Sequence, residues 1–328
     1  MTVTIYEVAS RAGVSISTVS RVLNDRGRVS KETEKKVLAA IKELDFHRNI
    51  NASGLAFQRT NIIGVLVFGF GDISIPEMYA LEFFAGLQEI SVREGYSLLV
   101  VNNCEDCVKL VKNKRMDGLI VHSSQDCPDL REYLATNGIP VIFVGDQLPD
   151  HPELDVYSDY ENLFRMGLSH FTGLGADKVC SIIYGNTDVS LNAQLALIAD
   201  LSAELGLNQG FQKDPFAFIV NGAEDPDTVW TRIGERIQAG FRHFFADSFY
   251  LAQQTIDAAV SLKKTVGKDL DVVCVEYEED QGAWLHPPIS GIYLPCREMG
   301  VQSMEILINK LNGDRVRSVA IMPRLTVR

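Results

Sequence analysis

Long apolar runs are missing from this chain. No stretch of 18 or more consecutive apolar residues occurs among its 328 residues, whereas a transmembrane helix needs about 20. The N-terminal segment MTVTIYEVASRAGVS also lacks the apolar core of a signal peptide. We therefore expect no membrane-spanning segment and no membrane partner, and we expect the protein to lie in the cytoplasm.

Cysteine is scarce, with six residues in the whole chain. Six thiols at this length do not make a disulfide framework, and in a reducing compartment they are expected to be small buried hydrophobes. Cys104 and Cys107 form a C-x-x-C motif, whose spacing suits zinc chelation or a redox couple. The motif has no second copy in the sequence. We therefore expect no metal and no cofactor, and retain a Cys104/Cys107 metal or redox site as an alternative.

Signatures of common enzyme classes are also absent. The sequence contains no GxSxG, no GxxxxGK[ST] loop and no GxGxxG after a strand. Its histidines are scattered without catalytic partners at a familiar spacing: His47, His122, His151, His170, His243 and His286. We therefore expect no catalytic residue and no enzyme activity.

Positive charge is in short supply, because the formal net charge is −12. The charge is unevenly distributed: residues 1–60 hold ten Lys and Arg against six Asp and Glu, whereas residues 61–328 hold 21 against 37. A basic N-terminal segment on an acidic body suits a protein that touches nucleic-acid phosphates at one end alone.

Three short helices fit the first 45 residues. Thr4, followed three residues later by Glu7, has the pattern of a capping box, and Ser15 precedes a helical run from Ile16 to Leu23. Ser30 is the expected cap of the third helix, where apolar residues recur at helical spacing: Val37, Leu38, Ile41 and Leu44. Residues 47–60 lack a core pattern and are predicted to link residues 1–46 to a core of residues 61–328.

The remainder of the chain alternates between strand-like and helical patterns. The expected strands are Ile62–Phe68, Ser97–Val101, Gly118–Val121, Val141–Val144, Val179–Ile183, Ala217–Val220, His243–Ala246 and Val272–Val275. Helical patterns such as Tyr79–Arg93 and Tyr160–Leu174 lie between them. This alternation predicts an α/β core with one doubly wound parallel sheet, or two.

The first two helices have the spacing of a helix-turn-helix. Ala9 is small enough for close helix contact, Gly13 can adopt the positive φ of the turn, and Val19 can pack back on the first helix. This packing places Ile16, Ser17 and Arg21 on the outward face. A three-helix domain without a nucleic-acid role is the plainer alternative, as is a scaffolding protein.

The outward face carries short polar side chains that suit DNA. Hydroxyl, amide and guanidinium groups are the donors that reach phosphates and base edges. The sequence supplies them at Ser15, Ser17, Thr18, Ser20, Arg21 and Asn24. We therefore predict a DNA-binding module rather than a plain helical domain.

Several segments also carry a resemblance. TIYEVASRAGVSISTVSRVLND and VSKETEKKVLAAIKELDF, within residues 3–46, carry it most strongly, and it continues in GVLVFGFGDISIP, MDGLIV, IPVIFVGD, LGADKV and VAIMPRLTVR. The chain resembles the lactose-repressor (LacI/GalR) family. The resemblance implies a transcription regulator, most often a repressor, that binds a palindromic operator as a homodimer.

The resemblance also implies roles for individual residues. Ile16, Ser17 and Arg21 match base-reading positions of the recognition helix. Phosphate-holding positions match Thr4, Ser15, Thr18, Ser20, Asn24, Ser30 and Thr33. Residues 49–56 match a hinge helix, and Leu55 matches the leucine that wedges into the minor groove. Arg48 replaces the usual proline, and Gly54 lies inside the short helix, where glycine costs about 1 kcal/mol relative to alanine.

For the core, the resemblance implies a periplasmic-binding-protein-like fold. Two α/β lobes would close on a small molecule at the carboxyl ends of their strands. Asp72 and Ser74 match the first-lobe loop, whereas Gln194 stands where the family has a ligand-clamping arginine. The Asn-Asp pair of the family reads Asp247-Ser248, and its Gly-Tyr-Asp-Asp turn reads as residues 276–279, Glu-Tyr-Glu-Glu.

These departures define the expected effector. An arginine clamp suits carboxylate or phosphate ligands, so its loss argues against an anion. A sugar-like or other neutral molecule, a cation, or no ligand at all stay open, as does control by a protein partner. The candidate effector-binding residues are Asp72, Ser74, Gln194, Asp247 and Glu278.

Overall fold

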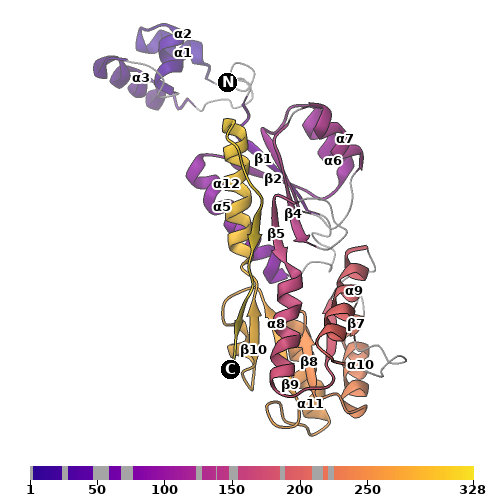
Figure 1. Ribbon diagram of the computed structural model, residues 1–328. Helices are drawn as coiled ribbons and strands as arrows, with labels where there is room; N and C mark the ends of the chain where they lie inside the picture. Colours follow the sequence, from indigo (N-terminus) through magenta and orange to yellow (C-terminus); the bar gives the residue numbers. More distant parts are fainter. Residues whose placement is uncertain are drawn as a thin grey trace. The chain divides into compact units, whose positions relative to one another are not determined.

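The chain folds into two compact units, Met1–Thr60 and Asn61–Arg328. The computed structural model describes residues 3–23, 29–46, 59–67, 77–122, 128–137, 139–147, 154–184, 189–208, 217–220 and 225–328 (Figure 1). Among the helices of these ranges, none combines the length and apolarity needed to cross a lipid bilayer.

The first unit contains the three helices expected from the sequence: α1 (Ile5–Ala12), α2 (Ile16–Leu23) and α3 (Lys31–Glu43). The capping box of Thr4 and Glu7 is present, and Ser30 accepts a hydrogen bond from the Thr33 amide. Gly13 ends α1 in the left-handed conformation, with φ 67° and ψ 34°. The predicted helices and their caps are confirmed.

A small apolar core holds these helices together. Val8, Val19 and Val37 are fully buried, one from each helix, and Ala9 and Ala40 pack beside them. An exposed ion pair of 2.6 Å between Arg11 and Glu43 also joins α1 to α3. The predicted role of Val19 as the inward residue of α2 is confirmed.

The second unit has two lobes, each built on a six-stranded sheet. In lobe one the order is β11-β5-β4-β3-β1-β2, and every pair is parallel. Its strands are β1 (Ile62–Val67), β2 (Ser97–Val101), β3 (Gly118–His122), β4 (Val141–Gln147), β5 (Val156–Asp159) and β11 (Val319–Ile321). The helices around it are α5 (Glu77–Glu94), α6 (Cys104–Lys112), α7 (Pro128–Asn137) and α12 (Cys296–Asn312).

Lobe two repeats this plan with one difference. Its order is β12-β10-β9-β8-β6-β7, with β6 (Cys180–Tyr184), β7 (Ala217–Val220), β8 (His243–Ala246), β9 (Asp271–Glu276), β10 (Ser290–Tyr293) and β12 (Arg324–Thr326). The helices are α8 (Tyr160–Gly173), α9 (Val189–Glu204), α10 (Pro226–Gln238) and α11 (Phe249–Ser261), with a short 3-10 helix, η1 (Gln281–Trp284).

The edge strand β12 runs antiparallel to β10, whereas the other strand pairs of lobe two are parallel. The physical reason lies in the connections. The chain leaves β10 toward lobe one, where α12 packs, and it returns directly from β11 into β12. The two strands therefore run in opposite directions, as an added edge strand often does.

Both faces of each sheet are buried, which explains the apolar runs in the sequence. In β1, Ile63, Val65 and Val67 pack with α5 and α12, whereas Leu66 points to the α6 and α7 side. In β9, Val273 and Val275 face α8 and α9, while Val272 and Cys274 face α10 and α11. Parallel sheets covered by helices on both faces read as continuous apolar runs.

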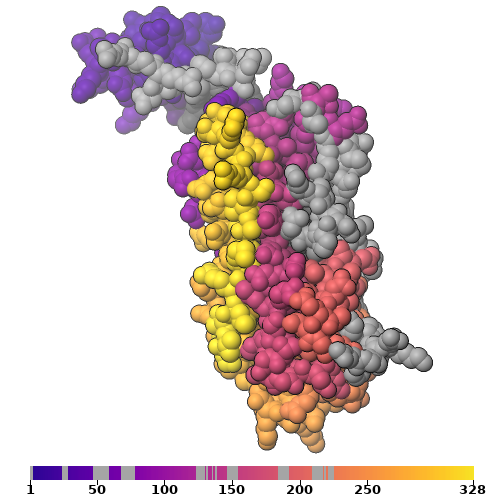
Figure 2. All heavy atoms as spheres, in the orientation of Figure 1, coloured from indigo at the N-terminus to yellow at the C-terminus, as the bar shows by residue number. Residues whose placement is uncertain are grey.

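The lobes are joined where the chain crosses between them. The described chain crosses at β5–α8, at β10–α12 and at β11–β12, and the C-terminal segment, in yellow, extends along both lobes (Figure 2). One hydrophobic cluster includes Ile120 of lobe one together with Phe164 and Val273 of lobe two. The carboxyl ends of the parallel strands in each sheet therefore point toward the other lobe.

Candidate nucleic-acid interface and effector cleft

Helix α2 presents its polar side chains to solvent. Ile16, Ser17 and Arg21 are exposed, because burial of Val19 at 0% exposure fixes the opposite face of the helix inward. Ile16 is an apolar residue on this polar face, and its side chain is 40% exposed. An exposed apolar side chain beside hydroxyl and guanidinium donors suits contact with base edges and thymine methyl groups.

Hydroxyl groups cluster at the start of α2. The Ser15 Oγ atom lies 2.8 Å from both Ser17 Oγ and Thr18 Oγ1, and it accepts a hydrogen bond of 3.2 Å from the Thr18 amide. A helix N-terminus carries unpaired N–H groups and a partial positive charge. This arrangement can receive a phosphate group.

The other two helices also begin at hydroxyl residues. Thr4 donates to Glu7 Oε2 from its amide, at 2.7 Å, and from its hydroxyl, at 2.9 Å. These hydrogen bonds, led by the one from the Thr4 amide, lower the pKa of Glu7. At α3, Ser30 Oγ and Thr33 Oγ1 lie 2.8 Å apart. Thr4 and Ser30 are exposed, while Thr18, Ser20 and Thr33 are half-buried.

Some predicted residues lie outside the described part of the chain. For the DNA interface these are Asn24, Leu55 and the hinge positions Arg48 and Gly54. For the effector site they are Asp72 and Ser74.

The three remaining effector candidates all belong to lobe two. Asp247 follows β8 and is 7% exposed, and Gln194 lies on α9 and is 8% exposed. Glu278, half-buried, follows β9 by two residues. Tyr277 links two of these segments, because its hydroxyl donates to the Asp247 carbonyl at 3.1 Å. The structure therefore brings Asp247 close to the turn that carries Glu278.

An aromatic contact that the sequence analysis missed spans the two lobes. Tyr79 of α5 and Tyr277 of lobe two meet edge to face, with ring centroids 5.6 Å apart. Tyr79 Oη lies 2.6 Å from His122 Nε2, at the end of β3, and donates to Met299 Sδ at 3.2 Å. Desolvation by burial lowers the pKa of His122 to about 4, so its ring is neutral at pH 7.

The predicted effector residues that the structure describes are neutral or acidic. Asp247 and Glu278 carry carboxyl groups, and Gln194, predicted at the position of a clamping arginine, carries a neutral amide. His122, neutral because burial lowers its pKa, lies near Tyr277 through its contacts with Tyr79. A set of groups of this kind does not favour an anionic ligand.

Comparison with known proteins agrees with this geometry. Residues 4–49 match the family described as bacterial regulatory proteins, lacI family, and residues 169–328 match a periplasmic binding protein-like domain. Catabolite control protein A of Staphylococcus xylosus is 27% identical, over 96% of this chain and 94% of that protein. The transcriptional repressor PurR of Photobacterium profundum is 26% identical, over 99% and 97%.

The chain belongs to the LacI family. A crystal structure of the lac repressor dimer, bound to operator and the anti-inducer ONPF, superimposes with a TM-score of 0.82 and 25% identity, covering 100% of this chain and 98% of that one. The predicted fold class, a helix-turn-helix headpiece with two α/β lobes, is confirmed. The protein is a DNA-binding transcription regulator.

In this LacI-family chain the two cysteines of the C-x-x-C motif differ in state. Cys104, the first residue of α6, takes part in a disulfide bond, whereas Cys107 is a free thiol. Cys107 is fully buried in the core of lobe one, and burial raises its pKa to about 11. Cys104 and Cys107 are therefore not bonded to each other in this structure, and their role as a metal or redox pair stays a prediction. In the described ranges, no cluster of three His, Cys, Asp or Glu residues could hold a metal ion.

Proposed function

We propose that this regulator is a repressor that binds a roughly palindromic operator as a homodimer, with a small molecule in the interlobe cleft as its control. Residues 1–46 form the DNA-binding headpiece, residues 47–60 the hinge helix and linker, and residues 61–328 the effector-binding and dimerisation core. Because it acts on operator DNA, we place it in the cytoplasm. The observation that carries the proposal is the exposed polar face of α2 on a three-helix unit with its own apolar core.

In this proposal the headpiece residues divide into two groups. Ile16, Ser17 and Arg21 enter the major groove and contact base edges, because they share the outward face of α2. The hydroxyl residues at the helix starts hold phosphates and so fix the orientation of α2 on the duplex. The phosphate group comprises Thr4, Ser15, Thr18, Ser20, Ser30 and Thr33, with Asn24, and Leu55 acts in the hinge.

An exposed apolar stripe on lobe one supports the dimer. Leu81 and Val92 of α5 are 61% and 70% exposed, and their spacing of about three helical turns places them on one face. The edge strand β2 adds Val100, 44% exposed. We propose that this surface pairs with its copy in a second chain, since a two-fold protein dimer matches a palindromic site.

The neutral and acidic candidate residues favour a neutral or cationic effector. A sugar-like molecule would use Gln194, Asp247 and Glu278 as hydrogen-bond partners, beside the buried rings of Tyr79 and Tyr277. A cation would gain from the same carboxylates.

Two measurements test the proposal. Repeated selection from random duplex DNA should yield a two-fold symmetric site, bound by two chains per duplex in analytical ultracentrifugation. Selection without a consensus, or one chain per symmetric site, would contradict it. A thermal-shift screen of the full chain should find sugars, nucleosides or amines that stabilise it, by about 2.7 kcal/mol at 100 times the dissociation constant. Stabilisation by organic anions alone would reject the proposed effector class.

A further inference from the structure

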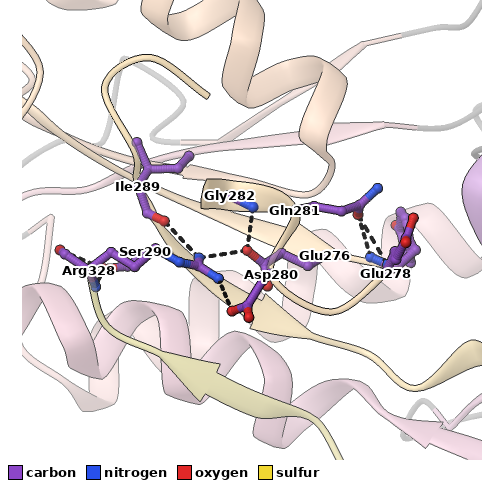
Figure 3. A network of polar contacts seen from close by, with 9 residues as sticks. Glu276, Glu278, Asp280, Gln281, Gly282, Ile289, Ser290 and Arg328 are labelled. Atoms are coloured by element: carbon purple, nitrogen blue, oxygen red, sulfur yellow. Dashed lines mark hydrogen bonds and ion pairs between the residues drawn. The ribbon is translucent and has the colours of Figure 1, made fainter. Parts of the chain in front are cut away.

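Glu276, the last residue of β9, has a fully buried carboxylate. Its Oε1 atom accepts a hydrogen bond of 2.6 Å from the Gly282 amide and an ion-paired one of 2.8 Å from Arg328 Nη1 (Figure 3). The Oε2 atom is buried and accepts no hydrogen bond from the described residues. A buried carboxylate is costly unless it is paired, so this charge depends on Arg328.

Two glycines make room for this side chain. A Cβ atom at Gly291 would lie 2.0 Å from Glu276 Oε1, and one at Gly282 would lie 2.7 Å from the same atom. The family turn that resembles residues 276–279 begins with glycine, so this chain places a glutamate where the resemblance implies no side chain. The space for that glutamate comes from β10 and η1, and its counter-charge comes from Arg328, two residues after β12.

Arg328 joins three segments at once. Its guanidinium bonds Glu276, the Ile289 carbonyl at 2.9 Å and Asp280 at 2.5 Å (Figure 3). Its backbone is also fixed, because the Arg328 amide donates a hydrogen bond of 3.0 Å to Ser290 Oγ. The side chain is 13% exposed. Arg328 therefore holds both ends of the turn from β9 to η1.

The turn held in this way carries the cleft residues. Gln281 Oε1 accepts hydrogen bonds from the amides of Tyr277, at 2.8 Å, and Glu278, at 3.2 Å. Gln281 is itself buried, between Asp280 and Gly282. A shift of the Glu276–Arg328 pair would move Gln281 and, with it, the ring of Tyr277 that meets Tyr79 of lobe one.

We propose that Glu276 and Arg328 are positioning residues of the effector cleft, whose buried ion pair sets the β9–η1 turn and thereby the contact of Tyr277 with Tyr79 across the lobes. The inference rests on the proposed function in taking this cleft as the effector site. It adds that Arg328, two residues after the edge strand β12, controls the shape of the cleft from outside it.

The first test is hydrogen exchange on the full chain without ligand or DNA. In Glu276→Gln, which keeps an acceptor for Gly282 but removes the charge, amides of residues 277–282 should exchange at least tenfold faster. Glu279→Gln is the matched control, because it removes the same charge from the same turn at a side chain that is 67% exposed. Equal exchange in the two variants would overturn the proposal.

Arg328 supplies a second set of variants if Glu276→Gln folds poorly. Arg328→Gln should also speed exchange in the turn, since it leaves Glu276 unpaired. The double variant, Glu276→Gln with Arg328→Gln, should return toward wild-type rates, because no buried charge is left without a partner. A double variant that exchanges as fast as the two single effects combined would contradict an ion-pair role.

The last readout separates positioning from local stability. If Glu276 acts on lobe one through Tyr277, then the effects of Glu276→Gln and Tyr79→Leu on the thermal midpoint should be non-additive. Glu279→Gln with Tyr79→Leu should be additive, and additivity for both pairs would overturn the proposal. These measurements need neither operator nor effector. Failure to bind DNA or small molecules would therefore reject the proposed function and leave the positioning result to be judged separately.

Discussion

Arg21 is the residue on which sequence recognition should depend most. Its exposed side chain lies four residues from Ser17, on the same outward face of α2. A guanidinium can contact guanine with two hydrogen bonds, worth about 1–3 kcal/mol of discrimination. We expect Arg21→Ala to lower affinity for the selected operator by that amount, with a much smaller loss on random DNA, in binding isotherms at one salt concentration.

A control for this variant is Arg11→Ala. It removes the same charge from the headpiece, but at a side chain paired with Glu43 rather than on the face of α2. Its effect should be similar on operator and random DNA. If Arg21→Ala also weakens both equally, then Arg21 contacts phosphate and does not read bases.

His122 gives the core a pH dependence of known sign. Because the folded-state pKa is about 4 and that of an unfolded histidine is about 6.5, the unfolded chain binds more protons between these values. Stability is therefore highest above about pH 6.5 and falls as the pH is lowered toward 4, by about 1.4 kcal/mol per pH unit at most. Urea unfolding of wild type and His122→Gln should show a smaller pH slope in the variant. Identical slopes would mean that His122 titrates normally.

At the scale of elements, the crossing of α5 and α12 depends on two glycines. A Cβ atom at Gly86 would lie 2.0 Å from the Arg297 carbonyl oxygen, and one at Gly300 would lie 2.1 Å from the Phe83 carbonyl oxygen. Alanine would favour each helix by up to about 1 kcal/mol, but backbone atoms cannot move aside as a side chain can. We therefore expect the steric clash to outweigh the gain in helix propensity.

We therefore expect Gly86→Ala to destabilise the core by about 1–3 kcal/mol, the usual cost of overpacking. Gly234→Ala in α10 is the matched control, since its Cβ would have only Leu262 Cδ1 within reach, at 3.9 Å. That variant should be stabilised by up to about 1 kcal/mol. The denaturant midpoints of the two variants and the wild type measure these changes in stability. A stabilised Gly86→Ala would show that α5 and α12 can separate without cost.

At the scale of the whole molecule, assembly should depend on the exposed stripe of α5. Leu81→Glu with Val92→Glu places two charges in the proposed dimer surface, where burial without a partner is unfavourable. We expect sedimentation of this variant to show a monomer and its operator affinity to fall sharply, because one headpiece then contacts only half of the site. Leu174→Glu, at a residue 56% exposed in lobe two, is the control and should remain dimeric. If the α5 variant is still a dimer, then the dimer surface lies elsewhere on the protein.

Local patterns in the sequence were enough for much of the fold. Ser15, Thr4 and Ser30 precede their helices as expected, and eight apolar runs coincide with β1 to β4 and β6 to β9. The short strands β5, β10, β11 and β12, of three or four residues each, were not predicted. β5 (VYSD) and β10 (SGIY) contain polar or glycine residues that break an apolar run, and β11 and β12 have only three residues each, so their pairing comes from neighbouring strands.

The outward face of α2 follows from the sequence because it depends on one helix and its cap. The inward orientation of Val19 fixes the direction of the Arg21 side chain, and both residues belong to α2. The cleft contacts do not follow, since Tyr79 and His122 are 43 positions apart and Glu276 and Arg328 are 52 apart. The sequence around Tyr79 and around Glu276 shows no local pattern that indicates which residue each of them contacts. Only the packing of two sheets and the return of β12 to the edge of lobe two brings those groups within hydrogen-bond distance.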